Sequence, residues 1–377
     1  MNTERQKKES LLRNSGFQTI IGSLLCIVIG LLVGYLVLLI INPGGAAKAI
    51  TAILKNFLYY PSAIAAKKYF GTTLVKASAL LMCSLSVLFA WKVGLFNIGA
   101  AGQYVVGAGA CLYCGLKFSL PWYVCLIAAV AAAAAAGGIS GALKAYFNVN
   151  EVISCIMLNW MGLYSVNMLL SAVKEQSTPY TKPLTSTNKS ALLPNAGLDQ
   201  IFSKNEFVTI GLPLAVLMAV AVWIILEKTK FGYELKATGM NKSAAKYCGM
   251  REKRNIILTM VIAGALAGFG AGIFYLTGIE QWMVQQTSVP AMGFNGIAAA
   301  FLGGSNPIGA VFSSYFIQHI TSGGTYVDKT MYCSQISDLI SAFIIYLCGF
   351  VLFFKVWLNR YLDKHNEKQN IQKGGAA

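Results

Sequence analysis

Charged residues are scarce in this sequence. Asp, Glu, Lys and Arg make up only 12% of its 377 residues, whereas soluble domains average about 25%. Hydrophobic residues make up 56%, above the roughly 45–50% of a soluble domain. A soluble protein of this length has no interior large enough for that excess, so the surplus must face lipid. The composition therefore excludes a soluble globular protein and predicts an all-α, polytopic transmembrane bundle of about eight to ten spans.

Histidine is rarer still, and residues that usually carry catalysis do not cluster. Two histidines are present, which argues against a histidine-based metal site. The nine cysteines fall mostly inside apolar segments, and Cys111 and Cys114 have no second pair at zinc-finger spacing, so we expect buried thiols that bind no metal. His319, near the end of an apolar run, is expected to be a satisfied interfacial side chain. We therefore predict no catalytic residue and no metal site, and a membrane-embedded enzyme is the weakest alternative.

A nucleotide-binding loop is also missing. No stretch of the chain matches the G-x-x-x-x-G-K-[ST] pattern, whose backbone N–H groups cradle phosphates. If the chain takes part in ATP-driven transport, another polypeptide must hydrolyse the ATP. This chain itself is therefore expected to bind no cofactor and to be no enzyme.

The basic residues are distributed in a way that indicates membrane topology. The formal net charge is +16, but the basic residues lie between apolar runs rather than along one solvated face, which argues against nucleic-acid binding. The first run, 17–41, is too long for a signal peptide and follows several basic residues, which predicts a cytoplasmic N-terminus. With about ten crossings, all five arginines face the cytoplasm. Cytoplasmic tails at 1–16 and 358–377 then flank a membrane region at 17–357.

Apolar runs of span length recur between polar connections. We predict spans at 17–41, 72–92, 94–115, 121–146, 151–172, 207–226, 255–277, 288–303, 307–320 and 334–357. The short runs 288–303 and 307–320 are separated by a helix-breaking Gly-Gly-Ser-Asn-Pro stretch, which predicts either two half-helices or a re-entrant pair. Among the connections, 173–206 should be extracellular, 227–254 cytoplasmic, and 42–71 long enough to form a surface helix.

Small residues recur on two of these runs. An alanine run at 129–136 is followed by Gly137 and Gly141, and glycines recur at every fourth position from Gly264 in a later run. Small residues at this spacing let helix backbones approach closely in a membrane. Both patterns therefore predict tight helix packing, and neither specifies a function.

A polar stretch at 94–103 interrupts the apolar pattern. Its glycines and two amides, Asn97 and Gln103, break a region that is otherwise hydrophobic. Irregular backbone at membrane depth survives only where it is buried in protein or lines a wet cavity, and broken helices often build the substrate path of transporters. Asn97 and Gln103 are therefore candidate path residues. The alternative is an ordinary cytoplasmic turn in which Asn97 caps a helix.

Three further path candidates belong to the run that begins at 151, and one to a later block. Glu151 lies at the predicted start of a helix, where the macrodipole favours a carboxylate whether or not it contacts substrate. Asn159 lies deeper, and its amide requires an interhelical partner or water. Trp160 offers an aromatic stacking surface. Asn295, in the apolar run before the Gly-Gly-Ser-Asn-Pro break, completes the set.

The cytoplasmic connection contains a short predicted helix. Asn241 is a good N-cap and Gly249 a good C-terminal stop, and Ala244, Ala245 and Cys248 would share one face. A face of small residues lets a partner dock closely. The alternative, a membrane-surface amphipathic helix, would have a meagre apolar face. The candidate docking residues are Gly239, Asn241, Ala244, Ala245, Tyr247 and Gly249.

Four blocks together resemble a known family. The sequences at 94–103, 150–154, 231–247 and 293–309 resemble, in this order, the permeases of ABC importers of the ribose, branched-chain amino-acid and simple-sugar class. The nearest branch resembles the larger permease of bacterial nucleoside importers. Ala101 departs from the family pattern, which usually has Glu at this position, so a carboxylate role there cannot be carried over.

The resemblance implies a function and a set of partners. It implies a nucleoside importer in the bacterial cytoplasmic membrane, in which the helix at 239–249 is the coupling helix that fits a groove of a separate ATPase subunit. It also implies a second, paralogous permease as heterodimer partner and an extracellular substrate-binding lipoprotein. A pentose or furanose sugar is the alternative cargo. A stand-alone secondary transporter is the alternative of another class, although the predicted spans carry almost no ionisable residues away from their ends.

Overall fold

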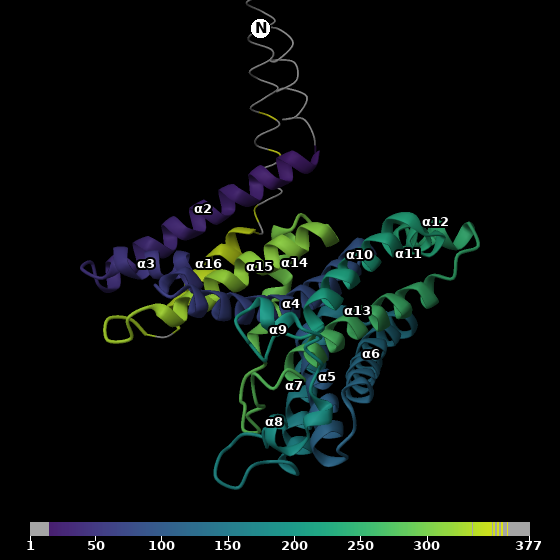
Figure 1. Ribbon diagram of the computed structural model, residues 1–377. Helices are drawn as coiled ribbons and strands as arrows, with labels where there is room; N and C mark the ends of the chain where they lie inside the picture. The colour runs from purple at the N-terminus through teal and green to yellow at the C-terminus, as the bar shows by residue number, and fades with distance from the viewer. Residues whose placement is uncertain are drawn as a thin grey trace, which may run out of the picture.

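The computed structural model describes residues 15–333 and 335–348, with positions 350, 353, 356 and 360. In this part of the chain the β pairing is limited to two isolated bridges, Lys174–Thr181 and Tyr180–Met283, and the predicted all-α class is confirmed (Figure 1). The predicted tails lie almost entirely outside these residues. The helices are α2 (Ser15–Ile41), α3 (Ala46–Lys55), α4 (Ala63–Lys92), α5 (Ala100–Lys117), α6 (Trp122–Phe147), α7 (Glu151–Ser171), α8 (Leu184–Thr187), α9 (Leu198–Ile201), α10 (Gly211–Lys228), α11 (Lys230–Met240), α12 (Lys242–Tyr247), α13 (Glu252–Tyr275), α14 (Ala291–Leu302), α15 (Pro307–Gly323) and α16 (Ile336–Cys348).

Six of these helices are long and apolar enough to cross a membrane by length and composition, namely α2, α4, α6, α7, α10 and α13. The other four predicted spans correspond to α5, α14, α15 and α16. Helix α5 is rich in glycine and is buried along most of its length. Because its neighbours shield it from lipid, α5 does not need the hydropathy of a lipid-facing helix.

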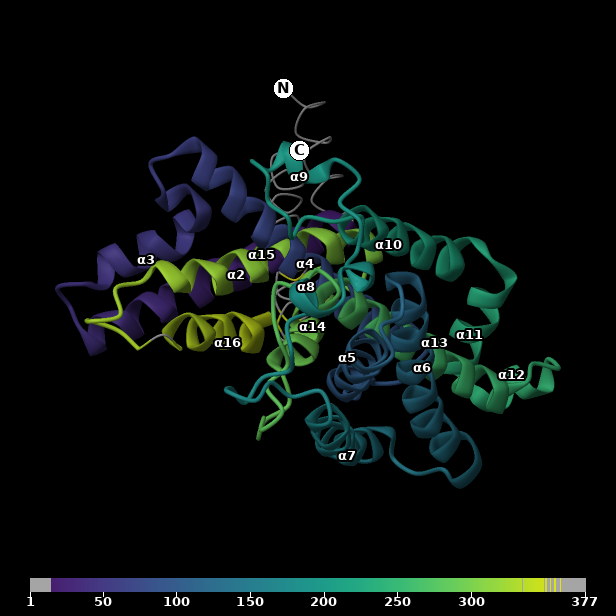
Figure 2. The same cartoon turned by 60° about the horizontal axis from the view of Figure 1, so that its bottom comes forward.

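The bundle has two flanks with separate cores. Helices α2, α3, α15 and α16 lie on one side of α4, whereas α6, α11, α12 and α13 lie on the other (Figure 2). Helices α6 and α13 pack closely along a row of glycines. A Cβ atom at Gly264 would lie 2.3 Å from the carbonyl oxygen of Ala133, and one at Gly268 would lie 2.4 Å from that of Ala129. The predicted close approach of the small-residue runs is therefore observed between these two helices.

The break before Pro307 forms a helical hairpin. Asn306 caps α15 by accepting a hydrogen bond from the backbone N–H of Ile308, and the hydroxyl of Ser313 donates to the carbonyl of Ala299 at 2.5 Å. Helices α14 and α15 therefore fold back on each other, which is the arrangement of a re-entrant pair. Helix α14 begins at Ala291 rather than at 288, because the preceding residues are not helical.

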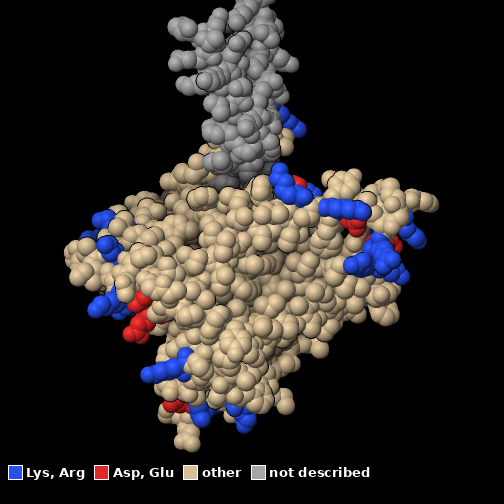
Figure 3. All heavy atoms as spheres, turned by 45° about the vertical axis from the view of Figure 1, so that its right-hand side comes forward, with Lys and Arg blue, Asp and Glu red and all other residues tan. Residues whose placement is uncertain are grey.

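Connections predicted to share one side of the membrane contact each other. On the predicted outer side, the amide of Asn188 donates to the carbonyl of Leu120 at 3.1 Å, and the hydroxyl of Tyr332 donates to the carbonyl of Asn42 at 2.6 Å. The face of the molecule in Figure 3 carries its basic and acidic side chains at its ends, with a broad uncharged region between them. A band without charges is the surface that a bilayer requires.

The connection at 42–71 contains a surface helix, as expected. Helix α3 buries Ala49 and Ile53 and exposes its lysines, and a short 3₁₀ turn follows before α4 begins at Ala63. His319, near the C-terminal end of α15, contacts both elements. Its Nε2 atom lies 2.9 Å from the carbonyl oxygen of Leu54 in α3, and its carbonyl accepts a hydrogen bond from the amide of Asn56 in the turn at 3.0 Å. The side chain is therefore a hydrogen-bonded interfacial histidine.

Candidate functional site

The segment at 93–99 re-enters the bundle. After α4 ends, the chain turns at Gly94, whose φ of +75° is readily adopted only by glycine. The amide of Asn97 then donates to the hydroxyl of Ser86 at 3.0 Å. Ser86 lies six residues before the last residue of α4, about 9 Å along the helix axis. The segment is therefore irregular backbone inside the protein rather than a turn at its surface.

Three amide side chains hold this re-entrant segment. Asn97 and Gln103 exchange hydrogen bonds of 2.8 and 3.1 Å, and both are buried. Asn159 of α7 donates to the carbonyl of Ile98 at 3.1 Å and accepts from the N–H of Gly102 at 2.9 Å. Asn159 thereby satisfies two backbone groups that the broken helix leaves free. Three of the predicted path residues are thus brought together, and their observed contacts support the backbone.

A cavity of about 270 Å³ adjoins this amide cluster between α5, α6 and α7. Gln103 and Asn159 contribute to its wall, and most of the remaining lining consists of small or apolar side chains. Asn97, Trp160 and Asn295 are not among the lining residues. The cavity is apolar with two amides at one edge, which is the usual character of a small-molecule pocket.

Glu151 forms an intramolecular ion pair. Its carboxylate lies 2.8 Å from the ammonium of Lys144 on α6, and both side chains are 16% exposed. Asn150 caps the same helix by accepting a hydrogen bond from the N–H of Val152 at 2.9 Å. The contacts of Glu151 therefore join the C-terminal end of α6 to the start of α7.

Trp160 lies on an open face of α7. It stacks on Tyr164 with ring centroids 6.1 Å apart and an interplanar angle of 26°, and both rings are substantially exposed. Met157, Met161 and Met168 are exposed on the same helix. These side chains sit at spacings of three, four and eight residues, so they share one stripe of the helix surface. We name this stripe the α7 face.

The start of α14 packs on the start of α5. A Cβ atom at Gly293 would lie 2.2 Å from the Cα atom of Ala101, and Ala101 is buried. A glutamate at 101 would have to displace α14, so this contact gives a physical reason for the alanine. Asn295 is half-buried two residues further along α14.

The segment at 277–290 is a second irregular region, which the sequence analysis missed. Asn167 of α7 donates to the carbonyl of Gln286 at 2.8 Å and accepts from the indole N–H of Trp282 at 2.9 Å. Thr287 and Ser288 between this anchor and α14 are exposed. The polar run at 285–288 and the proline at 290 were the available signals, because proline restricts the residue before it to extended conformations.

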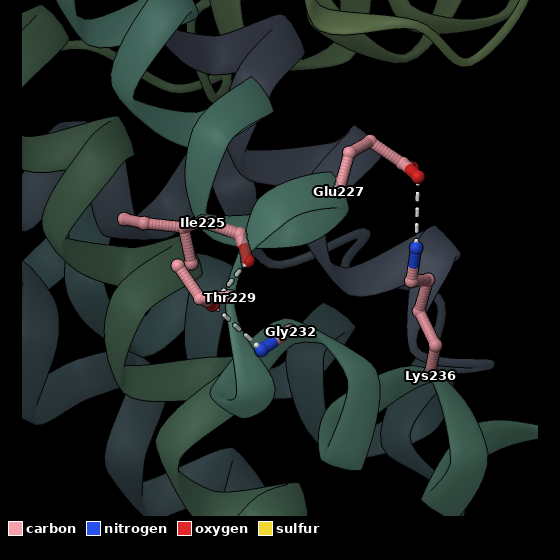
Figure 4. A network of polar contacts seen from close by, with 5 residues as sticks. All are labelled: Ile225, Glu227, Thr229, Gly232 and Lys236. Carbon is pink, nitrogen blue, oxygen red and sulfur yellow. Dashed lines mark hydrogen bonds and ion pairs between the residues drawn. The ribbon is translucent and has the colours of Figure 1, made fainter.

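Helices α11 and α12 project from the C-terminal end of α10 and are named here the coupling arm, after the role that the sequence predicts. At its base, the hydroxyl of Thr229 donates to the carbonyl of Ile225 at 2.6 Å and accepts from the N–H of Gly232 at 3.1 Å (Figure 4). The ammonium of Lys236 lies 3.0 Å from the carboxylate of Glu227. A Cβ atom at Gly232 would lie 2.1 Å from the carbonyl oxygen of Ile225, so the corner between the two helices is sterically fixed.

The tip of the coupling arm is α12. Asn241 accepts a hydrogen bond from the N–H of Ala244 at 3.0 Å, and Gly249 has a φ of +78°, so both predicted helix boundaries are present. Ala245, however, is only 3% exposed, whereas Ala244 is exposed. The expectation of one shared docking face was wrong for Ala245, because its side chain packs into the arm. Tyr247, at 93% exposure, is the most prominent side chain.

The coupling arm contacts the re-entrant segment directly. The hydroxyl of Thr238 accepts a hydrogen bond from the amide of Asn255 on α13 at 2.8 Å. A Cβ atom at the next residue, Gly239, would lie 2.1 Å from the carbonyl oxygen of Val93. Val93 precedes Gly94, where the re-entrant segment turns inward. A continuous chain of contacts therefore links the arm to the amide cluster.

These features are those of a transport protein, and the sequence comparisons agree. The family model described as branched-chain amino acid transport system / permease component matches residues 69–349. The chain belongs to this family. It is an ABC transporter permease, a multi-pass membrane protein that is not itself an enzyme, and its ATPase is a separate subunit.

Several curated relatives match most of this permease. The guanosine ABC transporter permease protein NupP of Bacillus subtilis is 34% identical over 85% of this chain and 90% of its own length. The nucleoside ABC transporter permease protein NupB of Lactococcus lactis is 31% identical over 97% of this chain and 100% of its own. The glucose ABC transporter permease protein TsgB13 of Haloferax volcanii is 30% identical over 76% and 78%. No solved structure matches the chain.

Proposed function

We propose that this permease forms one half of the translocation path of an ATP-driven nucleoside importer in the bacterial cytoplasmic membrane, with both termini in the cytoplasm. The observation that carries the proposal is the surface made by the α7 face and the segment at 285–290, which α7 anchors through Asn167. It combines stacked aromatic rings with an irregular segment whose polar residues Gln285, Thr287 and Ser288 are exposed. Lipid does not tolerate such backbone, so this surface requires a wet path or a protein partner.

A second, paralogous permease is the partner that this surface suits. Gln286 is anchored to α7 near its outer end, and Gly293 packs on Ala101 beside the amide cluster. The exposed segment therefore runs from the outer end toward the interior of the bundle. A homologous permease packed on the same surface would enclose the path. An extracellular lipoprotein would deliver cargo to the outer end, next to the connection at 173–206.

Nucleosides are the cargo that we propose. A nucleobase has an aromatic face, and stacking on an aromatic side chain contributes roughly 1–3 kcal/mol per base. Trp160 and Tyr164 supply such rings on the α7 face, and Asn295 lies half-buried on α14. The relatives named for guanosine and nucleosides support this cargo, whereas the relative named for glucose supports a sugar as the alternative.

The coupling arm is proposed to transmit the ATPase cycle. Tyr247, Ala244 and Asn241 at its tip would contact the ATPase. The fixed corner at Gly232 makes α10 and α11 move as one body, and the Gly239–Val93 contact would pass the movement to the re-entrant segment. The re-entrant segment would then shift relative to Asn159 and the rest of α7. Alternating access needs such a two-state element, which both cargo and ATPase can bias.

Uptake of radiolabelled guanosine tests the cargo. Cells that express this permease with its partner subunits should take up guanosine in an ATP-dependent manner, and cells without this chain should not. Excess unlabelled ribose should leave the uptake unchanged. Inhibition by ribose would assign the path to sugars, and uptake that persists after ATP depletion but collapses with the proton gradient would support a secondary transporter instead.

A further inference from the structure

A basic groove lies between the base of the coupling arm and the start of α13. Its volume is about 690 Å³. Its wall includes three basic side chains, Lys230, Arg251 and Arg254, and a single carboxylate, Glu234. Phe231 and Met250 add apolar surface. The groove is separate from the amide cluster and the α7 face. Gly249 of the predicted docking set also lines it, but the proposed transport function assigns no role to its basic side chains.

The cations of this groove lack intramolecular partners. Among the residues that the structure describes, the ion pairs are Lys144–Glu151 and Lys236–Glu227, and neither involves Lys230, Arg251 or Arg254. Three positive charges therefore face one negative charge. An unbalanced set of guanidinium and ammonium groups in one concave site favours an anion, and guanidinium groups bind phosphate through paired hydrogen bonds.

Neighbouring side chains indicate the depth of the groove relative to the membrane. The ammonium of Lys228 lies 5.5 Å from the ring centroid of Trp223 at the end of α10, and that of Lys253 lies 5.2 Å from the ring of Tyr146 at the end of α6. Tryptophan, tyrosine and lysine at helix ends are typical of the membrane–water interface. Lys228 and Lys253 are close in sequence to Lys230 and Arg254, so the groove lies at the level of the lipid headgroups.

We infer that this groove binds the phosphate of an anionic phospholipid headgroup in the leaflet at the coupling-arm end. Arg251, Arg254 and Lys230 contact the phosphate, while Phe231 and Met250 contact the glycerol backbone and first methylenes. The Glu234 carboxylate on the same wall partly opposes the bound anion. A bound headgroup here would bridge the base of the coupling arm and the start of α13.

Native mass spectrometry of the assembled transporter tests this site. The complex is released from membranes that contain equal phosphatidylglycerol and phosphatidylcholine, and the retained lipids are counted. Neutralising Lys230, Arg251 and Arg254 to Gln should lower phosphatidylglycerol retention about fivefold per side chain. A matched triple variant at the opposite end, with Lys117, Lys189 and Lys204 changed to Gln, should retain the wild-type amount.

Three results would overturn the inference. The first is equal phosphatidylglycerol retention by the groove variant and the wild type. The second is complete displacement of the lipid by millimolar inorganic phosphate, which would assign the groove to a soluble anion. The third is loss of the ATPase subunit from the groove variant, which would assign the groove to the subunit interface. Glu234→Gln guards against a folding artefact, because it removes a repulsive charge and should raise retention.

Discussion

The α6–α13 interface and the α7 face differ in what they leave uncovered. Between α6 and α13, glycines allow backbone atoms to meet, and Gly264 lies against the carbonyl of Ala133 with no room for a side chain. On α7, Trp160, Tyr164 and three methionines are exposed, and the adjacent segment is irregular. An interface completed within one chain is thus close-packed, whereas a surface that needs a second molecule carries large, adaptable side chains.

The largest expected effect comes from filling the α6–α13 interface. A Cβ atom at Gly137 would lie 2.2 Å from the carbonyl oxygen of Met260, which belongs to the backbone and cannot rotate away. Gly137→Ala should therefore destabilise the permease by about 3 kcal/mol, seen as a lower melting temperature in detergent. The neighbour Gly138 is the control, because its Cβ would meet only a side-chain methyl of Val261 at 3.1 Å. Equal melting temperatures for both alanine variants would contradict this close packing.

The amide cluster, although it adjoins a cavity, belongs to the buried interior whose contacts are completed within this chain. Asn159→Leu would leave the carbonyl of Ile98 and the N–H of Gly102 without their observed partners. Each unsatisfied buried group costs about 1–3 kcal/mol, so we expect a loss of about 2–4 kcal/mol in thermal stability and a parallel loss of uptake. Ser165→Ala, which alters another lining residue of the same cavity, should leave stability unchanged. Loss of uptake at full stability would indicate direct cargo contact instead.

Helix α12 shows the same contrast between a buried and an exposed surface at two neighbouring alanines. Ala245 is buried and Ala244 is exposed. Ala245→Arg should unfold the tip of the coupling arm, because the guanidinium cannot be buried there without a partner. Ala244→Arg should leave the arm folded and reduce ATPase co-purification at least tenfold. Limited proteolysis between 240 and 250 separates the two outcomes, and equal cleavage of both variants would contradict the observed orientation.

The sequence predicted those parts of the fold that depend on local chemistry. Asn241 begins α12 because an N-cap needs only a side-chain oxygen, and Gly249 follows the end of the helix because it tolerates a positive φ. Asn306 and Pro307 begin α15 for similar local reasons. Features that depend on packing between distant parts of the chain were harder to predict. Asn97 could be read as a helix cap until its exchange of hydrogen bonds with Gln103 was visible, and the orientation of Ala245 depends on how α12 packs.

The smallest effect on stability and the most specific effect on function are expected at Trp160. The ring is 41% exposed and stacks only on Tyr164, which is exposed as well, so Trp160→Ala should change stability within about 0.5 kcal/mol. Loss of one stacking surface should nevertheless reduce guanosine uptake roughly tenfold, and Trp160→Phe should restore most of it. Tyr123→Ala, at a similarly exposed ring at the start of α6, is the control for a lipid-facing aromatic. If both alanine variants transport guanosine equally, the α7 face does not line the path, and the exposed aromatic rings would then contact lipid or the partner permease away from the cargo.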